Sequence, residues 1–159
     1  MDNIIDAMRQ IGAKNGVDIV FDEFGACALP LRDDRVLQIQ VRDEAGELDF
    51  VATLGTVPDE VRGSVFQSLL AANYYWKDTL GATLSWQDNL EQVLLSYPLP
   101  VATTDENTLE TAFVNFLKLQ EEWAVRLADD IAEARALLKA EDDDAVTEGD
   151  DSSAVRIVG

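Results

Sequence analysis

Paired carboxylates are the side chains in this sequence whose type and spacing come nearest to a catalytic site. Two neighbouring acids can perform general acid–base chemistry when burial separates their pKa values. Adjacent positions on a helix do not face each other, however, and unpaired acids are rarely buried. We therefore expect the four pairs to lie on the solvated surface; they are Asp22-Glu23, Asp33-Asp34, Glu121-Glu122 and Asp129-Asp130.

Other catalytic and metal-binding sites lack their usual residues. The sequence contains no histidine, which excludes His-dependent triads and His-ligated zinc sites. The single cysteine, Cys27, lies on the apolar phase of a predicted strand and is expected to be a small buried side chain. Asp144 could open a calcium loop with Gly149 at its sixth position, but Val146 and Val155 would then occupy ligand positions. We predict no catalytic residue, no cofactor site and no metal site, and hence a protein that is not an enzyme.

The charge of the chain limits its partners. Its 159 residues include 31 acidic and 12 basic side chains, which give a formal charge of −19. Such a charge repels phosphate groups, so nucleic acid is not expected as a partner and anionic membranes are disfavoured. No apolar run reaches the roughly 20 residues that span a bilayer, and the start of the sequence lacks the layout of a signal peptide. These features predict a cytoplasmic protein without membrane insertion.

The composition divides the chain into a domain and a tail. Residues 1–140 carry nearly all the apolar residues and are expected to form one domain with a single core. Residues 141–159 are rich in Asp and Glu and contain no aromatic residue. Such a segment buries too little apolar area to offset its ordering entropy, so we predict an acidic, disordered tail.

The first half of the chain changes from a helical to a strand period. Apolar residues recur at helical spacing over 2–15 and predict a first helix. From 26 to 54, apolar and polar residues alternate, with turn residues at 32–35 and 43–47. This pattern predicts a three-stranded antiparallel meander with one apolar face.

A second helix is predicted to start near Pro58, with Thr56 as its cap. Its apolar residues form two stripes about 100° apart round the helix. Either the helix is fully buried, or one stripe faces the core and the other faces a twin subunit. The two stripes are Val61, Val65, Leu69, Ala72 and Trp76, and Phe66, Leu70 and Tyr74.

The second half of the chain predicts a hairpin and a long helix. Alternating residues over 82–86 and 92–99 flank a turn, and Asn107 with Glu110 forms a capping-box-like start for a third helix. Unbroken from 108 to 139, that helix would be roughly 48 Å long. The whole order is helix-strand-strand-strand-helix-strand-strand-helix, which predicts a compact α+β domain with an antiparallel sheet.

This order resembles the class I type III secretion chaperones, the family named after the Tir chaperone CesT. The most specific stretch runs from an LLxxN-like helix end at 69–73 through GATLS to VLLSYPLP at 93–100. The resemblance implies a homodimer that pairs largely through the second helix and the neighbouring strand. The candidate interface residues are Val65, Leu69, Tyr74, Trp76 and Trp86.

The resemblance also implies a function and a binding groove. Such chaperones work in the bacterial cytoplasm and hold the N-terminal segment of a secreted effector protein in extended form, partly added to sheet edges, without ATP. The export machinery, or secretion apparatus, is a further possible partner. Carried onto this chain, the groove lies between the first helix and the meander, with core packing as the alternative for each residue. The candidate contacts are Ile5, Met8, Leu29, Leu37, Ile39 and Phe50.

Three other classes of function compete with this one. A protein-interaction or regulatory module of the same fold, outside secretion, would bind a folded partner. An enzyme that uses carboxylates would bind a metal ion. An acidic mimic of nucleic acid would bind basic DNA-binding proteins with a strong dependence on salt.

Overall fold

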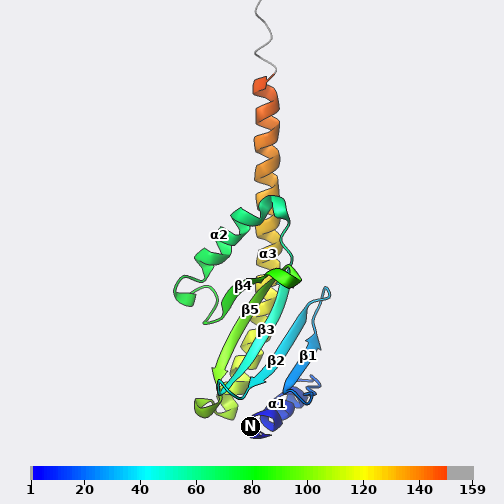
Figure 1. Cartoon of the computed structure of the whole chain (residues 1–159), viewed down its shortest axis with the longest axis vertical. Coiled ribbons are helices and arrows are strands. Elements are labelled where there is room, and N and C mark those ends of the chain that lie inside the picture. The colour runs from blue at the N-terminus through cyan, green and yellow to red at the C-terminus, as the bar shows by residue number, and fades with distance from the viewer. Residues whose placement is uncertain (1, 150–159) are drawn as a thin grey trace, which may run out of the picture.

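The computed structural model describes residues 2–149 and shows the α+β order that the sequence predicts (Figure 1). Helix α1 (Asp2–Lys14) precedes the meander, α2 (Arg62–Ala72) separates the meander from a hairpin, and α3 (Glu106–Gly149) follows the hairpin. The strands are β1 (Ala26–Pro30), β2 (Val36–Arg42), β3 (Glu47–Gly55), β4 (Thr83–Gln87) and β5 (Gln92–Pro100). They form one antiparallel sheet in the order β1-β2-β3-β5-β4. The homodimer stays a prediction.

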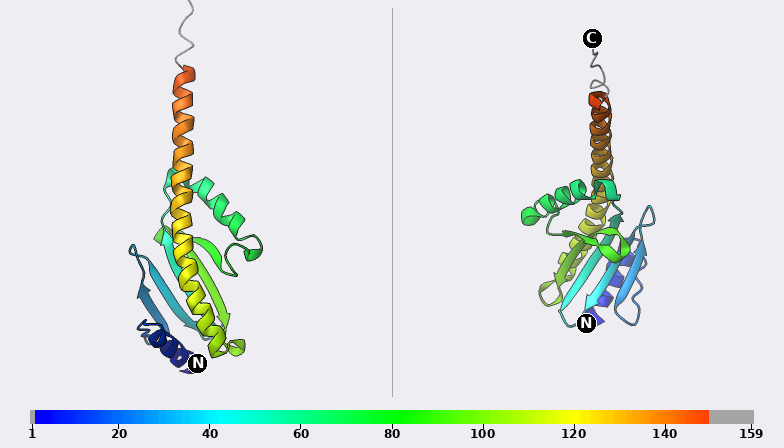
Figure 2. Two further views of the ribbon diagram at one scale, coloured as in Figure 1. Left: turned by 180° about the vertical axis from the view of Figure 1, so that it is seen from behind. Right: turned by 45° about the horizontal axis from the view of Figure 1, so that its top comes forward.

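One face of the sheet builds the core, because buried residues alternate with exposed or half-buried ones along the strands. Helix α3 runs along this face, in front of the sheet in the left view of Figure 2, and α1 lies beside the lower end of the sheet. The register places Ile39 opposite Phe50, so the two side chains share the face. The Phe50 ring lies against Phe113 and Phe116 of α3, with centroids 5.8 and 5.6 Å apart. The predicted one-sided meander is confirmed.

The opposite face of the sheet carries no helix within residues 2–149, as the front of Figure 1 shows. Its side chains are mostly polar and at least partly exposed, including Gln38 and Gln40 of β2. Arg42 pairs there with Glu47 and Asp49 of β3. An antiparallel sheet commonly has one packed and one solvated face, and this sheet follows that rule.

The start of the second helix differs from the prediction. A 3-10 turn, η1 (Asp59–Val61), comes before α2, and neither element has a side-chain cap. Thr56 is therefore not the cap that we expected. The 3-10 turn places the start of the regular helix beyond the reach of the Thr56 hydroxyl, so sequence spacing from Pro58 misjudged it.

The end of the second helix differs as well. Helix α2 ends at Ala72, and a second 3-10 turn, η2 (Tyr74–Trp76), follows. Tyr75 has a left-handed φ of 53°, which a continuous right-handed helix does not allow. The two predicted apolar stripes are therefore interrupted before Tyr74 and Trp76, whose directions are set by the turn.

Helix α3 begins with a different cap from the predicted one. Asp105 Oδ1 accepts a hydrogen bond from the Thr108 N–H at 2.7 Å. Hydrogen bonding to the side chain and backbone of Thr108 lowers the pKa of Asp105. Glu110, expected in a capping box with Asn107, instead pairs with Lys14 of α1 at 2.6 Å. Asp and Asn are about equally good caps, so residue type alone did not distinguish a start at Asp105 from one at Asn107.

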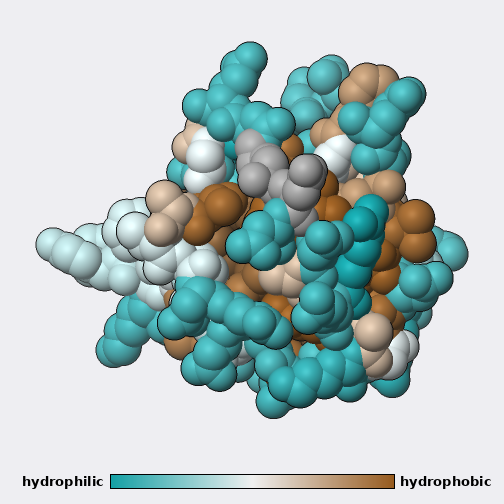
Figure 3. All heavy atoms as spheres, turned by 90° about the horizontal axis from the view of Figure 1, so that it is seen from below, coloured by the Kyte–Doolittle hydropathy of each residue, from teal (hydrophilic) through white to brown (hydrophobic). Residues whose placement is uncertain are grey.

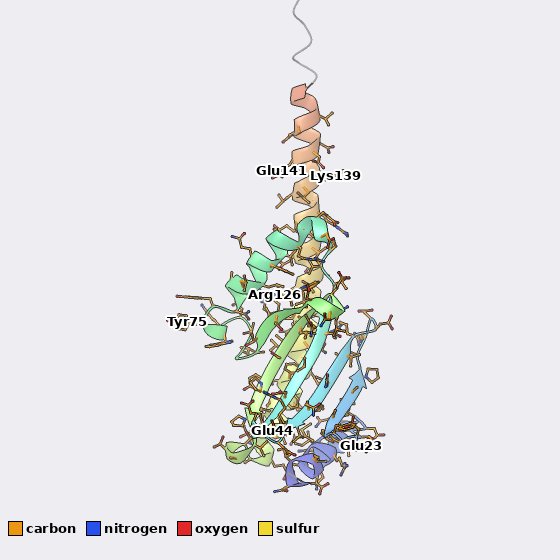
Figure 4. All side chains as sticks on the ribbon, in the orientation of Figure 1. Glu23, Glu44, Tyr75, Arg126, Lys139 and Glu141 are labelled. Atoms are coloured by element: carbon orange, nitrogen blue, oxygen red, sulfur yellow. The ribbon has the colours of Figure 1, made fainter. Side chains whose placement is uncertain are left out.

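Helix α3 extends far beyond the sheet. Its 44 residues correspond to about 66 Å, and its upper part projects from the domain, where Figure 4 labels Lys139 and Glu141. Ala134 is the last buried residue among the side chains described up to 146, and those from 135 to 146 are all exposed. The helix continues from 141 to 149, where the composition predicted disorder, because no proline or glycine interrupts it before Gly149. The predicted tail from 150 to 159 lies outside the described residues.

Candidate functional site

The six predicted effector contacts lie together between α1 and the sheet, but almost all of them are buried. Met8, Leu37, Ile39 and Phe50 have no exposed surface, and Leu29 has only 8%. Ile5 alone is half-buried. Core packing was the alternative given for each of these residues, and the buried ones belong to the core of their own chain.

The reason is that α1 and α3 cover the apolar face of the sheet together. Lys14 pairs with Glu110 and Asn15 hydrogen-bonds the same carboxylate, so the end of α1 is tied to the start of α3. Gly12 of α1 brings the chain close to Ile19, since a Cβ at Gly12 would lie 2.7 Å from Ile19 Cγ1. The groove predicted between α1 and the meander is therefore filled.

Apolar surface near α1 lies instead on the connection from α1 to β1. Val20 and Phe24 are 66% and 75% exposed. A pocket of about 500 Å³ borders the same connection and is lined by Arg9, Ala13 and residues 16–20. The sequence analysis assigned no role to this connection, although an apolar residue between Ile19 and Phe21 on the opposite phase was a signal for an exposed position.

The predicted dimer residues divide into buried and exposed ones. Val65 and Leu69 face the core and are 1% and 6% exposed. Tyr74 and Trp76 are exposed, and Trp86 is half-buried. Leu70 and Tyr75, which the candidate list omitted, are 70% and 78% exposed. We call the surface formed by the exposed and half-buried side chains of this region the aromatic corner; its residues are Phe66, Leu70, Tyr74, Tyr75, Trp76 and Trp86.

The aromatic corner projects from the body of the molecule. Figure 4 shows Tyr75 at the far end of the α2–β4 connection, pointing away from the sheet. Seen from below, the same side of the molecule extends as a pale arm with apolar spheres beside it (Figure 3). The ring of Tyr75 packs edge-on against Tyr74, with centroids 4.7 Å apart. The two rings therefore pack against each other and not against the core.

The base of the corner is fixed by packing and hydrogen bonds. Phe66 of α2 contacts Trp86 of β4 at 5.1 Å between ring centroids, and the Arg62 guanidinium lies 4.8 Å from the Trp86 ring. The Asn73 side chain accepts from the Leu84 N–H and donates to the Leu84 carbonyl, both at 2.9 Å. A largely apolar pocket of about 110 Å³ lies between α2 and β4. The base of the corner is therefore held in place by these contacts and contains a small apolar recess.

The corner is also the part of the chain where the acidic excess disappears. Residues 62–87 contain two cations, Arg62 and Lys77, and one acid, Asp78, for a charge of +1. The whole chain has −19, so the remaining residues carry −20. Charge depletion together with exposed aromatic rings is typical of the centre of a protein–protein interface.

Both edges of the sheet are partly closed by local side chains. On β4, Asn73 occupies both backbone groups of Leu84. On β1, the Asp22 carboxylate accepts from the Ala26 N–H and the Asp22 N–H donates to the Ala26 carbonyl. Pro30 has no N–H, and the β1–β2 register leaves Ala28 as the outward position between them. An added strand would find the backbone groups of Leu84 and Ala26 already bonded.

The paired carboxylates serve structural roles or lie in solvent. Asp22 closes the turn before β1, and Glu121 pairs with Arg35 at 2.8 Å, which lowers the pKa of Glu121. Burial raises the pKa of the Cys27 thiol. Within residues 2–149, no three His, Cys, Asp or Glu side chains are grouped so that they could hold a metal ion. None of the helices in this part of the chain combines the length and apolar content needed to cross a bilayer.

Several solved structures have the same fold as this chain. A chain of the ExsC–ExsE complex is 17% identical, with a TM-score of 0.66 over 79% of this chain and 94% of that one. A chain of the heterodimeric ExoU–SpcU complex from the type III secretion system of Pseudomonas aeruginosa is 18% identical, with a TM-score of 0.59 over 78% and 97%. YbjN, a candidate transcription regulator from E. coli, is 24% identical, with a TM-score of 0.51 over 84% and 93%. At these identities the likeness establishes the fold.

Comparison with curated protein sequences gives no significant match. A family model, in contrast, matches residues 6–124, from α1 to the part of α3 that crosses the sheet. The match covers most of the chain and includes the elements that form the core and the aromatic corner. The chain belongs to the Tir chaperone protein (CesT) family.

Proposed function

We propose that this protein is a cytoplasmic bacterial chaperone that holds the N-terminal segment of a type III secretion effector in extended form. The observation that carries the proposal is the family match over residues 6–124. The ExoU–SpcU complex, which has the same fold, comes from a type III secretion system. Binding of this kind needs shape, apolar surface and charge, and it needs no catalytic group.

The acidic surface supports the same function. A carrier that exposes apolar side chains must avoid aggregation, and a formal charge of −19 provides repulsion between copies. The exposed Val20 and Phe24 near α1 offer apolar contacts for a client segment. We assign client binding to the surface along α1 and the α1–β1 connection in place of the buried groove.

We further propose that two copies pair through the aromatic corner. In a two-fold dimer each copy contributes the same patch, so the patch must complement itself. The corner combines exposed rings with a recess of about 110 Å³, and its charge of +1 removes the repulsion that two acidic surfaces would meet elsewhere. Val65 supports this surface from the core side, and Leu69 lines the base of the recess.

A regulatory module of the same fold is the second candidate. YbjN, the candidate transcription regulator, has this fold at a TM-score of 0.51. The same apolar surfaces could then bind a folded partner. The state of the bound partner separates the two functions: an extended segment is protease-sensitive when free and protected when bound, whereas a folded domain is protected in both states.

The test is a gene deletion in the source bacterium combined with purification of the tagged protein under secretion conditions. We expect one secreted protein to co-purify, its N-terminal segment to be protected from limited proteolysis, and its secretion to fall while its transcript is unchanged. Recovery of folded cytoplasmic partners alone, with secretion unaffected by the deletion, would contradict the chaperone proposal and favour the regulatory module.

A further inference from the structure

A pocket of about 510 Å³ opens between the tip of the β1–β2 hairpin and α3, away from both α1 and the aromatic corner. This volume lies within the range of pockets that bind small ligands or single side chains. Ala124, Val125 and Ala128 of α3 line one wall, since positions three and four apart share a helix face. Leu54 at the end of β3 completes the apolar part. The small side chains of α3 leave the space open.

The rim of the pocket is acidic. Asp33 and Asp34, both in the hairpin turn, line it together with Glu121 of α3. Both aspartates have a left-handed φ of 57° and lie in solvent. No ion pair involves either of them among residues 2–149. Two uncompensated carboxylates therefore stand at the mouth of an apolar recess.

The cations near the pocket are already engaged elsewhere. Arg35 lines the pocket but is only 6% exposed, and its guanidinium binds the side chain of Gln120 and, at 2.8 Å, Glu121. Arg32 lies 3.8 Å from the other oxygen of Glu121. Glu121 is thus the partner of both arginines, and Asp33 and Asp34 keep their charge for a ligand.

We propose that this pocket receives an apolar and a basic side chain from the extended client segment. The apolar side chain packs against Leu54, Ala124 and Ala128, and the cation lies between Asp33 and Asp34. In an extended chain, residues i and i+2 point to the same side, so the two client residues are separated by one position. The inference rests on the proposed function, because an extended polypeptide is the ligand class that the function supplies.

The direct test uses synthetic peptides and methyl NMR of the full chain labelled at alanine. The probe is a capped peptide Gly-Ser-Leu-Ser-Arg-Ser-Gly, and its matched controls replace Arg by Glu or Leu by Ser. We expect saturable shifts of the Ala124 and Ala128 methyls with the probe, weaker binding when salt is raised, and no saturable shift with the Glu peptide. Absence of a saturable shift with the probe, or equal binding of the Glu peptide, would overturn the proposal.

Two variants test the two walls separately. Asp33→Asn with Asp34→Asn keeps residues that tolerate the left-handed turn and removes only the charges, so the probe should bind about threefold or more weakly. Ala128→Trp fills the recess from an exposed position, and binding should fall about tenfold or more. Ala136→Trp, exposed on the same helix above the pocket, is the control and should bind as the parent does. Unchanged binding in both pocket variants would refute the assignment.

The purified client separates this inference from the proposed function. A secreted client that binds the parent and the Ala128→Trp variant equally well would overturn the pocket assignment and leave the chaperone function standing. Peptide binding that depends on Asp33 and Asp34, in a protein with no secreted client, would support the pocket and contradict the chaperone function.

Discussion

Two apolar surfaces of this chain differ in exposure: one is buried within the chain and the other lies in solvent. Under α1 and α3, the apolar side chains of the meander are buried, and Phe50 has no exposed surface at all. At the aromatic corner, Leu70 and Tyr75 expose most of their surface. Both surfaces are apolar and regular in the sequence, so apolar periodicity identifies side chains that share a face but does not say whether the same chain covers that face.

The strongest test of the enclosed surface is the substitution Phe50→Ala. Removing a buried ring that packs against Phe113 and Phe116 leaves a cavity, and we expect a loss of about 3–5 kcal/mol of unfolding free energy in urea titrations. Gln38→Ala, exposed on the other face of the sheet, is the control and should change stability by less than about 0.5 kcal/mol. A Phe50→Ala variant that stayed stable but lost client binding would instead support the predicted role of Phe50 as a client contact.

The exposed surface is tested by Leu70→Gln combined with Tyr75→Asn. Asn tolerates the left-handed φ of position 75, so the turn is retained. Two exposed apolar anchors of the proposed dimer are lost, and we expect its dissociation constant to rise about 100-fold or more, measured by light scattering across concentrations. Leu137→Gln, on the projecting part of α3, should leave the association unchanged. A parent protein that is monomeric at micromolar concentration would refute the dimer itself.

Glu121 belongs to neither surface, and its ion pair with Arg35 makes stability depend on pH. Its folded pKa is lowered by the hydrogen bond from Arg35, so its stabilising contribution is present above the unfolded pKa and is lost as the pH falls through the folded pKa. Glu121→Gln should be less stable than the parent at neutral pH, and the difference should disappear in acid. Comparing two proteins removes the separate effect of acid on the net charge. A difference that persisted at low pH would mean that the Gln side chain disturbs packing.

The smallest effect is expected from shortening the projecting helix. A chain that ends at Ala140 keeps Ala134, the last buried position among the side chains described up to residue 146. We expect its unfolding free energy in urea to agree with that of the full chain within about 0.5 kcal/mol. A larger loss would show that residues 141–159 pack on the domain and would move the predicted boundary at 140.

The order and type of the elements could be predicted because each carries its own period. Alternation along 26–54 places Cys27, Leu37 and Phe50 on one face, and the structure confirms that face. The stretch 69–100 also sufficed to indicate the family. These signals are local, since they depend only on neighbours along the chain.

The site could be predicted only in part, because exposure depends on neighbours that are distant in sequence. The positions of Tyr74 and Trp76 were judged from a helix that in fact ends at Ala72, and no residue type at 73–75 marks the left-handed Tyr75. The pocket beside Asp33 and Asp34 joins a hairpin turn to a helix face nearly ninety positions later. A sequence pattern records neither the gap between them nor its shape.

The projecting end of α3 amplifies small changes in the orientation of the helix at the point where it leaves the domain. From Ala134 to Gly149 the helix extends about 22 Å, and every side chain described from 135 to 146 is exposed. A tilt of about 10° at Ala134 would displace the far end by about 4 Å, which a rigid helix transmits without further contacts. A spin label or fluorophore near the end of α3 would therefore magnify small changes in the seating of this helix, including those caused when a ligand enters the pocket beside Ala128.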